Sequence, residues 1–486
     1  MEIKKIKERN SLFVKFWSLA AIFHSVTFIW FFDGVSFLES FRILILIFSI
    51  IQILYSKHYY FFFSALLLSS SIVVVLPSRV PNHIFFEGII NLTIIGSLGI
   101  YGFNFYRGKI TLDEIHRKIN SYMSPLIVVS LALLYFFVVL HKLNFSFFDP
   151  YISCSADFFS KILEDYSLTR IEAIDTFHKT NYITLRNFSI YFAFLSELVI
   201  PILLFSKRFR NFGIAYGIFF HAILALYFHI GIYSFSAMMY SYYVFFFDSK
   251  SVSHFLVFFN NKKFKIGFVI ALVVLFTLYL CLPNIEDSLY LRQRFKLFSV
   301  GIFMFLLFAF LVLFQFVKSV GSFKNLFKPS TNTKLNLNFK TSGIVILLLF
   351  IFNGMCPYLG LKTEASFSMF SNLRTESDFN NHFFIPSSLR LFAYQDHIIT
   401  IEDSDIQLLS FYKDNKRHAI IPFELNKIIK STNNDFYILY NYKGKDMCLE
   451  RVNGVIQSDF LDVNSNFLLG HLMSFRPVLL DCECQH

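Results

Sequence analysis

Residues 11–32 of the chain read SLFVKFWSLAAIFHSVTFIWFF, and this stretch decides the fold class. The run is long enough to cross the hydrocarbon of a bilayer, which takes roughly 17–25 residues of α-helix. It follows Lys4, Lys5, Lys7 and Arg9, as the apolar part of a signal peptide would, but it is long and no clear small-residue cleavage site follows it. We therefore interpret it as a retained first membrane span.

The composition of the whole chain agrees with a membrane protein. Hydrophobic residues make up 55% of the 486 residues and only 16% are charged, whereas a soluble globular protein is usually about 25% charged. The 68 phenylalanines are attributed to a lipid-facing surface and to codon bias in an AT-rich genome. The net charge of +11 would suit a nucleic-acid partner, but the positive residues lie in short runs between apolar segments. That placement is typical of membrane topology, so we predict no nucleic-acid partner.

Further apolar stretches predict an all-α polytopic membrane bundle of about eleven spans. The predicted spans are Ser11–Phe32, Leu38–Tyr55, Tyr59–Leu76, Ile84–Phe105, Tyr122–Leu140, Asn187–Phe205, Phe212–Ile230, Tyr233–Phe247, Ile266–Leu282, Leu297–Val317 and Ser342–Tyr358. Positive residues favour alternate loops, with one exception in the outer loop that carries Arg292, Arg294 and Lys296. The bias predicts a multi-pass protein of the inner (cytoplasmic) membrane, N-terminus inside and C-terminus outside.

The character of the sequence changes after the last predicted span. From about Thr375 onward, polar turns alternate with short strand-like runs such as Ile398–Ile401 and Asp435–Tyr440, and Asn453-Gly454 is a plausible hairpin turn. We divide the chain into a cytoplasmic N-terminus (1–10), a transmembrane domain (11–362) and a small, mostly β, extracytoplasmic C-terminal domain (363–486). The six cysteines include no CxxC pair, so we predict no zinc ribbon and no metal site.

Ionisable groups inside membrane spans are expensive, so each has a structural and a functional interpretation. Lys142, at the outer end of the fifth span, either snorkels to the interface or is a partly desolvated general base. His83, at the start of the fourth span, is either a structural hydrogen-bonding group or a functional one. His221 falls mid-span and needs a partner within the bundle. Glu197 could pair with a base, cap a helix broken before Pro201, or be buried protonated.

The order and spacing of several motifs resemble those of the vitamin K-dependent γ-carboxylase-like family, the HTTM (horizontally transferred transmembrane) proteins. The resemblance covers roughly residues 11–382, and no single motif carries it alone. The motifs are Asn82-His83, the run Leu134–Asn144 that ends in His141-Lys142-Leu143-Asn144, Phe219–His221 with Phe228–Ser234, Asn353–Lys362 and Ser366–Leu373.

The resemblance implies a reaction and a set of site residues. In the family a lysine deprotonates a reduced naphthoquinone, oxygen adds, and the resulting strong base removes a proton from a glutamate γ-carbon, whose carbanion captures carbon dioxide. By this resemblance the cofactor is reduced vitamin K or menaquinone, dioxygen (O2) and carbon dioxide (CO2) are co-substrates, and the partners are the lipid bilayer and a peptide or protein substrate. We predict Lys142, His83 and His221 as catalytic residues, and Asn82, Glu197 and His229 as cofactor-binding residues; all but Glu197 lie in the motifs of the resemblance.

Three functions follow as hypotheses. The first is a γ-carboxylase-like or otherwise quinone-linked modifying enzyme, that is, a lyase. The eukaryotic carboxylase has a large extracytoplasmic region that binds a propeptide, whereas only residues 359–486 follow the last predicted span. The second is a non-catalytic membrane protein of peptide-toxin maturation or immunity. A small-molecule transporter ranks last, because the sequence has no apparent inverted repeat or paired broken helices.

Overall fold

A computed structural model gives the fold and describes residues 2–27, 36–55, 59–76, 80–227, 231–281, 289–330, 335, 337–377, 379–415, 417–458 and 467–480. The chain divides into two compact units. The first comprises Met1–Val75, His83–Tyr135 and Ser196–Leu348, and the second comprises Leu76–Asn82, Phe136–Leu195 and Leu349–His486. The predicted boundary at residue 362 therefore falls inside the second unit.

The first unit is a helical bundle. Its helices are α1 (Glu2–Thr27), α2 (Ser36–Leu54), α3 (Tyr60–Val75), α4 (Asn82–Tyr106), α5 (Leu112–Lys142), α9 (Tyr182–Phe205), α10 (Arg210–Leu224), α11 (Ile232–Tyr243), α12 (Ser249–Asn260), α13 (Lys262–Cys281), α14 (Leu289–Val320) and α15 (Thr341–Leu359). Two 3-10 turns, Val244–Phe246 and Phe323–Phe327, follow α11 and α14. Asn82, the end of α5, the start of α9 and the end of α15 belong to the second unit.

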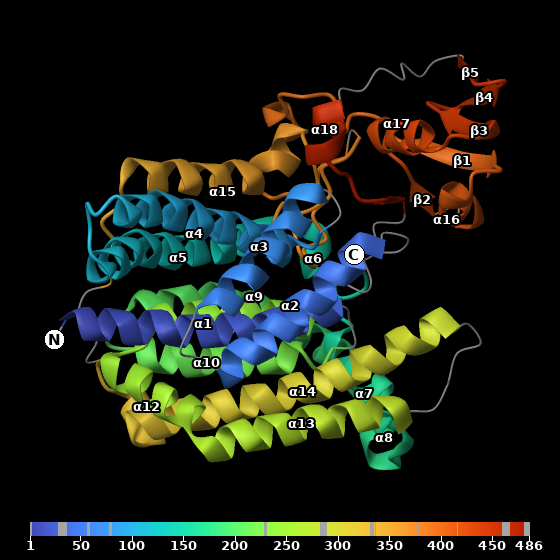
Figure 1. Cartoon of the computed structure of the whole chain (residues 1–486). Helices are drawn as coiled ribbons and strands as arrows, with labels where there is room; N and C mark the ends of the chain where they lie inside the picture. Colours follow the sequence, from blue (N-terminus) through green and yellow to red (C-terminus); the bar gives the residue numbers. More distant parts are fainter. Residues whose placement is uncertain are drawn as a thin grey trace. The chain divides into compact units, whose positions relative to one another are not determined.

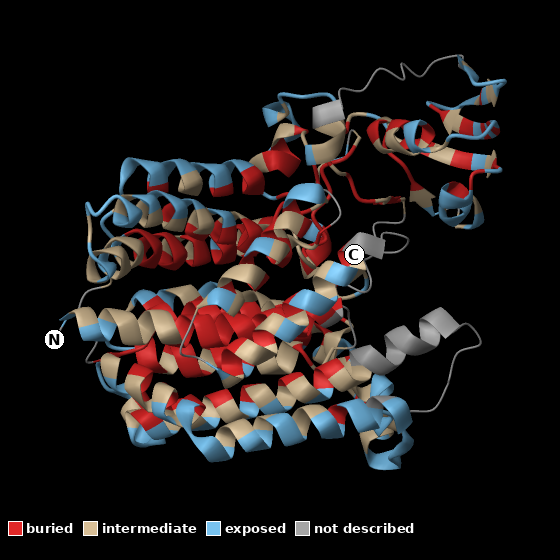
Figure 2. Ribbon diagram, in the orientation of Figure 1, coloured by how far each residue is buried: buried red, intermediate tan, exposed pale blue. Residues whose placement is uncertain are grey.

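Helix α1 lies at the core of this bundle and packs against α2, α11 and α12. Phe16 of α1 meets the rings of Phe255 and Phe259 of α12 edge-on, with centroids 5.5 and 5.6 Å apart. Such edge-to-face pairs add to the free energy gained by burying the rings. Figure 2 shows the buried residues gathered on the inward sides of the helices, with exposed residues outside. Aromatic packing around α1 therefore stabilises the core of the first unit.

Among the described residues, five helices are long and apolar enough to cross a membrane: Asn82–Tyr106, Leu112–Lys142, Tyr182–Phe205, Ser299–Val320 and Thr341–Leu359. The chain is mostly helical as predicted, but the prediction of about eleven spans is not supported. Apolar runs also build core helices, which need no membrane length. For example, α11 has only 12 residues, nearly all of them buried, and an apolar helix of about 10–14 residues is typical of a buried core.

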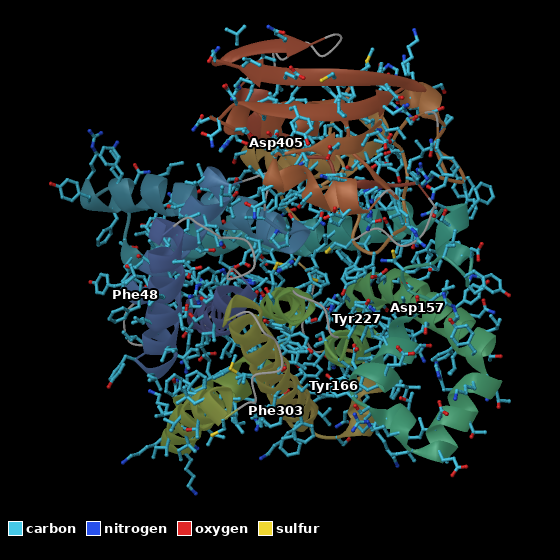
Figure 3. The ribbon with its side chains drawn as sticks, turned by 90° about the vertical axis from the view of Figure 1, so that its right-hand side faces the viewer. Phe48, Asp157, Tyr166, Tyr227, Phe303 and Asp405 are labelled. Carbon is cyan, nitrogen blue, oxygen red and sulfur yellow. The ribbon has the colours of Figure 1, made fainter. Side chains whose placement is uncertain are left out.

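The candidate spans also expose apolar side chains, as contact with lipid requires. On α14, Phe303, Phe310 and Phe314 are each more than half exposed, and Figure 3 labels Phe303. An exposed apolar surface of this kind is unusual for a protein in water. The exposed phenylalanines therefore agree with a helix that faces lipid.

The second unit adds short helices and two small sheets. Its further elements are α6 (Phe145–Phe148), α7 (Phe158–Asp165), α8 (Glu172–Thr180), β1 (Ile399–Ser404), α16 (Ser410–Asp414), β2 (His418–Ala419), α17 (Pro422–Ser431), β3 (Phe436–Tyr442), β4 (Lys445–Val452), β5 (Val455–Ser458), α18 (Phe467–Leu472) and β6 (Val478–Leu479), with 3-10 turns at Leu168–Arg170, Ser387–Leu389 and Gln407–Leu409. The antiparallel order is β1-β3-β4-β5, and β2 pairs with β6.

The alternating pattern of β3 explains how the larger sheet packs. Phe436, Ile438 and Tyr440 are buried while the residues between them are exposed, which is the two-residue period of a strand with one face on a core. That face packs in one cluster with Leu425 and Ile429 of α17, which lies beside the sheet in Figure 1. The predicted strand region near the C-terminus is thus confirmed.

The predicted turn at Asn453-Gly454 is also confirmed. These two residues join β4 to β5, because Val452 pairs with Val455. Both have positive φ, 53° for Asn453 and 78° for Gly454. Two consecutive left-handed residues make the turn whose twist matches a hairpin, and Asn-Gly adopts it at the lowest cost.

Candidate functional site

Lys142 is the last residue of α5 and lies in the second unit. Its side chain is only 2% exposed. Its Nζ donates to the carbonyl oxygen of Met369 over 3.5 Å and lies 5.7 Å from the centroid of the Phe147 ring. A snorkelling lysine would carry its ammonium out to water, so this burial favours the interpretation of Lys142 as a functional group.

The segment that reaches Lys142 has an unusual backbone. Between residues 365 and 377, five residues other than glycine have a φ in the left-handed region: Ala365 (50°), Phe367 (67°), Phe370 (49°), Asn372 (52°) and Ser377 (58°). That conformation is uncommon for side chains with a Cβ, and bulky residues adopt it only when their surroundings impose it. Strain of this kind gathers at functional sites. We define residues 363–377 as the strained segment.

Side-chain amides impose that conformation. Asn82 accepts a hydrogen bond from the backbone N–H of Phe367 at 2.6 Å, and Asn353 donates to the carbonyl of Ala365 at 2.8 Å. Asn144 donates to the carbonyl of Ser371 at 2.7 Å. Asn82 thus positions the strained segment. Its predicted contact with a cofactor stays a prediction.

His141 ties α5 to α15 within the second unit. Its ring is buried, and Nε2 donates to the carbonyl of Gly354 at 2.9 Å. A Cβ on Gly354 would lie 2.5 Å from the ring of Phe137, so glycine is required for the two helices to approach this closely. His141 therefore orients the helix end that carries Lys142.

Asn381 is a central residue of this site that the sequence analysis did not single out. Its Nδ2 donates to the side chains of Asn144 and Ser146 and to the carbonyl of Asn372, at 3.2, 3.0 and 2.7 Å. Its Oδ1 accepts from the backbone N–H of Arg374 at 2.9 Å. One buried amide thus joins the strained segment to the turn after Lys142. An asparagine in a polar stretch carries no local pattern that would have revealed this.

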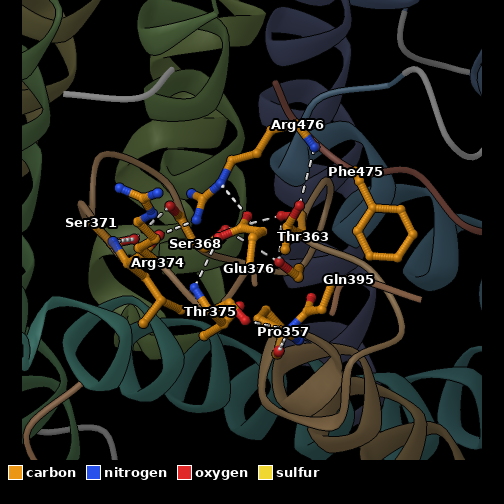
Figure 4. Close-up of polar contacts among 12 residues, drawn as sticks. Pro357, Thr363, Ser368, Ser371, Arg374, Thr375, Glu376, Gln395, Phe475 and Arg476 are labelled. Atoms are coloured by element: carbon orange, nitrogen blue, oxygen red, sulfur yellow. Dashed lines mark hydrogen bonds and ion pairs between the residues drawn. The ribbon is translucent and has the colours of Figure 1, made fainter. Parts of the chain in front are cut away.

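A buried ion pair holds the far end of the strained segment (Figure 4). The Nε atom of Arg476 lies 3.1 Å from Oε1 of Glu376, and its guanidinium also donates to the carbonyl of Leu373. The other carboxylate oxygen of Glu376 accepts from the backbone N–H of Thr375 at 2.8 Å. Because both charges are buried and hydrogen-bonded, removing either would leave an uncompensated charge.

The hydrogen bonds of His382 fix its tautomer. Its Nδ1 accepts from the backbone N–H groups of Phe384 and Ile385, both at 3.0 Å, so Nε2 carries the proton and donates to the carbonyl of Leu140 at 3.0 Å. Burial lowers the pKa of His382 below its ordinary value of 6.5. A proton added at Nδ1 would break both backbone hydrogen bonds.

We therefore expect the stability of the protein to fall in acid partly through His382. Below about pH 6.5 the unfolded chain binds a proton at this residue that the folded chain does not, so the free energy of unfolding falls with pH. His382→Asn should be less stable than the wild type at about pH 8 and should lose stability less steeply between about pH 6.5 and pH 5. Thermal unfolding of both proteins across this range measures the difference, and parallel curves would contradict the expectation.

His83 and His221 lie in the first unit, on either side of one phenylalanine. The ring centroid of Phe235 is 5.9 Å from that of His83 and 5.2 Å from that of His221. His83 Nε2 lies 2.9 Å from the hydroxyl of Ser234, and both histidines are buried. The structure thus brings together two of the three predicted catalytic residues. Lys142, the third predicted catalytic residue, belongs to the other unit.

His221 has the partner within the bundle that the sequence predicted it to need. Its Nε2 lies 3.0 Å from the hydroxyl of Tyr135, which lies 2.6 Å from the hydroxyl of Tyr243. A Cβ on Gly217 would lie 2.6 Å from that Tyr243 hydroxyl, so the glycine makes room for it. His221 is therefore the end of a buried chain of hydroxyl groups.

The remaining predicted residues have different outcomes. Glu197 lies in α9, which continues without a break through Pro201 to Phe205, so the carboxylate does not cap a broken helix. Proline has no N–H, so Pro201 donates no helical hydrogen bond within α9. The Glu197 carboxylate interacts electrostatically with Tyr135. His229 lies outside the described residues.

Within the described part of the chain, no group of three His, Cys, Asp or Glu side chains could hold a metal ion. Cys154, between α6 and α7, is disulfide-bonded. Its backbone N–H donates to Asn372 of the strained segment at 2.7 Å. The disulfide region and the lysine site are therefore parts of the same unit.

Comparison with known proteins does not identify a family for the chain. No protein-family model, no curated protein and no solved structure matches the chain. The function must therefore be argued from the site itself.

Proposed function

We propose that the chain is a polytopic membrane enzyme of the vitamin K-dependent γ-carboxylase-like (HTTM) type, in which Lys142 is a general base acting on a reduced naphthoquinone. The observation that carries the proposal is the meeting of four separate motifs around this lysine. In the second unit, His141 bonds to Gly354, Lys142 to Met369, Asn144 to Ser371 and Asn82 to Phe367. Motifs that carry the resemblance in sequence thus make one site in space.

The surroundings of Lys142 suit a proton transfer. The amine is enclosed by protein, so a proton taken from a bound hydroxyl does not exchange freely with water. The carbonyl of Met369, which accepts from Nζ, orients the amine, and the hydrogen bonds of Asn144 and Asn381 fix the backbone around it. A base held in this way needs little reorganisation when the reaction begins.

Aromatic rings pack together in the part of the second unit that contains Lys142. The Phe147 ring lies beside Nζ, and the Phe367 ring lies 6.3 Å from that of Phe137 and 6.2 Å from that of Phe350. Aromatic side chains with one convergent polar group are typical of small-molecule sites. Reduced vitamin K or menaquinone would supply an acidic hydroxyl and the reducing power for its own oxygenation by dioxygen. Lys142 would accept the proton of that hydroxyl.

The disulfide supports the proposed orientation of the site. Disulfides persist on the oxidising side of the inner membrane and are rare in the cytosol. Cys154 lies between α5 and α9, in the loop that the positive residues predict to be outside. We infer that the lysine site opens toward the extracytoplasmic side, where a peptide or protein substrate would meet it.

The test is a carboxylation assay. Purified full-length protein in lipid nanodiscs would receive reduced menaquinone, dioxygen, radiolabelled bicarbonate and a set of glutamate-containing peptides. We expect label to enter peptide only when quinol and dioxygen are both present, and mass spectrometry should locate it as γ-carboxyglutamate. Incorporation that ignores the quinol, or none with every peptide and no oxidised quinone product, would contradict the proposed function.

A further inference from the structure

Four buried polar side chains of the first unit form a continuous row. They come from α1, α4 and α11 and are Glu87, His24, Ser234 and His83, each at most 2% exposed. Oε2 of Glu87 lies 2.5 Å from Nε2 of His24. Nδ1 of His24 lies 2.5 Å from the Ser234 hydroxyl, which lies 2.9 Å from Nε2 of His83. Of the four, only His83 is among the catalytic residues predicted from the sequence.

One arrangement of protons satisfies every contact in this row. The hydroxyl of Ser234 has a single proton and lies between two imidazoles, so it donates to one and accepts from the other. With the proton of His24 on Nε2, which lies in ion-pair contact with Oε2 of Glu87 at 2.5 Å, Nδ1 of His24 accepts from Ser234. Ser234 then accepts from Nε2–H of His83, and Nδ1 of His83 is the basic end of the row.

We propose that Glu87, His24 and Ser234 form a proton relay that ends at His83, with Glu87 as the acceptor. A proton that binds at Nδ1 of His83 displaces the proton on Nε2 to Ser234. Ser234 passes its own proton to Nδ1 of His24, and His24 passes the proton on Nε2 to the Glu87 carboxylate. One proton enters, the carboxylate becomes a carboxylic acid, and both imidazoles end neutral in the other tautomer.

The helix contacts show why a purely structural role is insufficient. Helices α1 and α4, which carry His24 and Glu87, are also joined by a neutral contact. Nε1–H of Trp17 on α1 donates to Asn91 on α4 at 3.2 Å. Asn91 lies one helical turn beyond Glu87 and cannot change its charge. Burying a carboxylate and two imidazoles costs far more free energy than burying this neutral pair. A chain of titratable groups beside an adequate neutral contact points to a function that uses their protons.

The backbone near Ser234 is built to admit His83. Gly231, which precedes α11, has a φ of 90°, a conformation that L side chains rarely adopt. A Cβ there would lie 3.3 Å from Cε1 of His83. Glycine thus lets the first turn of α11 bring Ser234 within hydrogen-bonding distance of both imidazoles.

The relay goes beyond the proposed function, because it requires only that His83 receives a proton. Among the described residues, the titratable groups that face Glu87 from other helices are His24 of α1 and Tyr242 of α11. Infrared difference spectroscopy of the full-length protein in nanodiscs, recorded after a downward pH step, detects a carboxylate that becomes protonated. No substrate is needed, so failure of the carboxylation assay and failure of the relay are distinguishable.

We expect a protonated-carboxyl band in the wild type that Glu87→Gln removes. The band should also be lost in Ser234→Ala and in His83→Gln, which retain Glu87 but interrupt the row at two different places. Ser234→Thr, which keeps a hydroxyl, should restore it. The matched control is Asn91→Ala, which breaks the neutral contact between the same helices and should leave the band unchanged.

Thermal unfolding of each variant identifies any that fails to fold. Whichever of Ser234→Ala and His83→Gln folds then decides the test. A band that persists at full amplitude in a folded Ser234→Ala or His83→Gln protein would overturn the relay, because Glu87 would then be protonated by another route. A wild type without any band that depends on Glu87 would overturn it as well.

Discussion

Lys142→Arg should abolish the activity of the protein while the chain still inserts and accumulates. A guanidinium cannot give up its proton near neutral pH, so arginine retains the charge and loses the base. General-base catalysis contributes a factor of about 10² to 10⁴, and we expect a loss of that size. The measurement is the rate of label incorporation, or of quinone oxidation, at equal amounts of folded protein.

Two further variants keep this prediction decisive. Because the site is buried and arginine is larger than lysine, Lys142→Ala provides an inactive variant without added bulk, and small primary amines should restore part of its activity. Lys161→Arg, an exposed lysine of the same unit, is the matched control and should remain active. Retained activity in Lys142→Arg would return Lys142 to the role of a structural cation.

Asn381→Ala should cause the largest loss of stability among the variants proposed. The change removes the bonds that the two protons and the oxygen of this amide make with Asn144, Ser146, Asn372 and Arg374. It leaves buried donors and acceptors without partners, each at a cost of about 1–3 kcal/mol. We expect the free energy of unfolding to fall by about 3 kcal/mol or more. Thermal and denaturant unfolding of the protein in detergent measures the change.

Asn381→Asp separates the loss of donors from the loss of shape. Aspartate keeps the oxygen that accepts from Arg374 but has no amide protons and faces the acceptor oxygens of Asn144 and Asn372, so it should destabilise the protein nearly as much as alanine does. Asn434→Ala, at an exposed position before β3, is the control and should unfold like the wild type. A stable Asn381→Asp protein would show that the amide donors contribute little.

Short stretches of sequence were sufficient to predict those elements that are determined by neighbouring residues alone. The Asn453-Gly454 turn was predictable because two left-handed residues favour this dipeptide wherever it occurs. The alternation in β3 and the long apolar helices were predictable from periodicity, because burial on one face repeats at the spacing of the element. The number of spans was not, because the predicted span Tyr233–Phe247 forms only a 12-residue helix, α11, whose residues are nearly all buried within the first unit.

The sequence by itself determined that the chain is mostly helical, that several helices have membrane length and that a strand region lies near the C-terminus. It also singled out Lys142, His83 and His221, because ionisable groups within apolar runs are conspicuous. Only the tertiary structure decided which residues surround them. His24 and Ser234 are 210 residues apart, and Asn144 and Asn381 are 237 apart. Such pairs form only when helices pack in one register, since a hydrogen bond requires its atoms within about 3 Å, and no local pattern specifies that register.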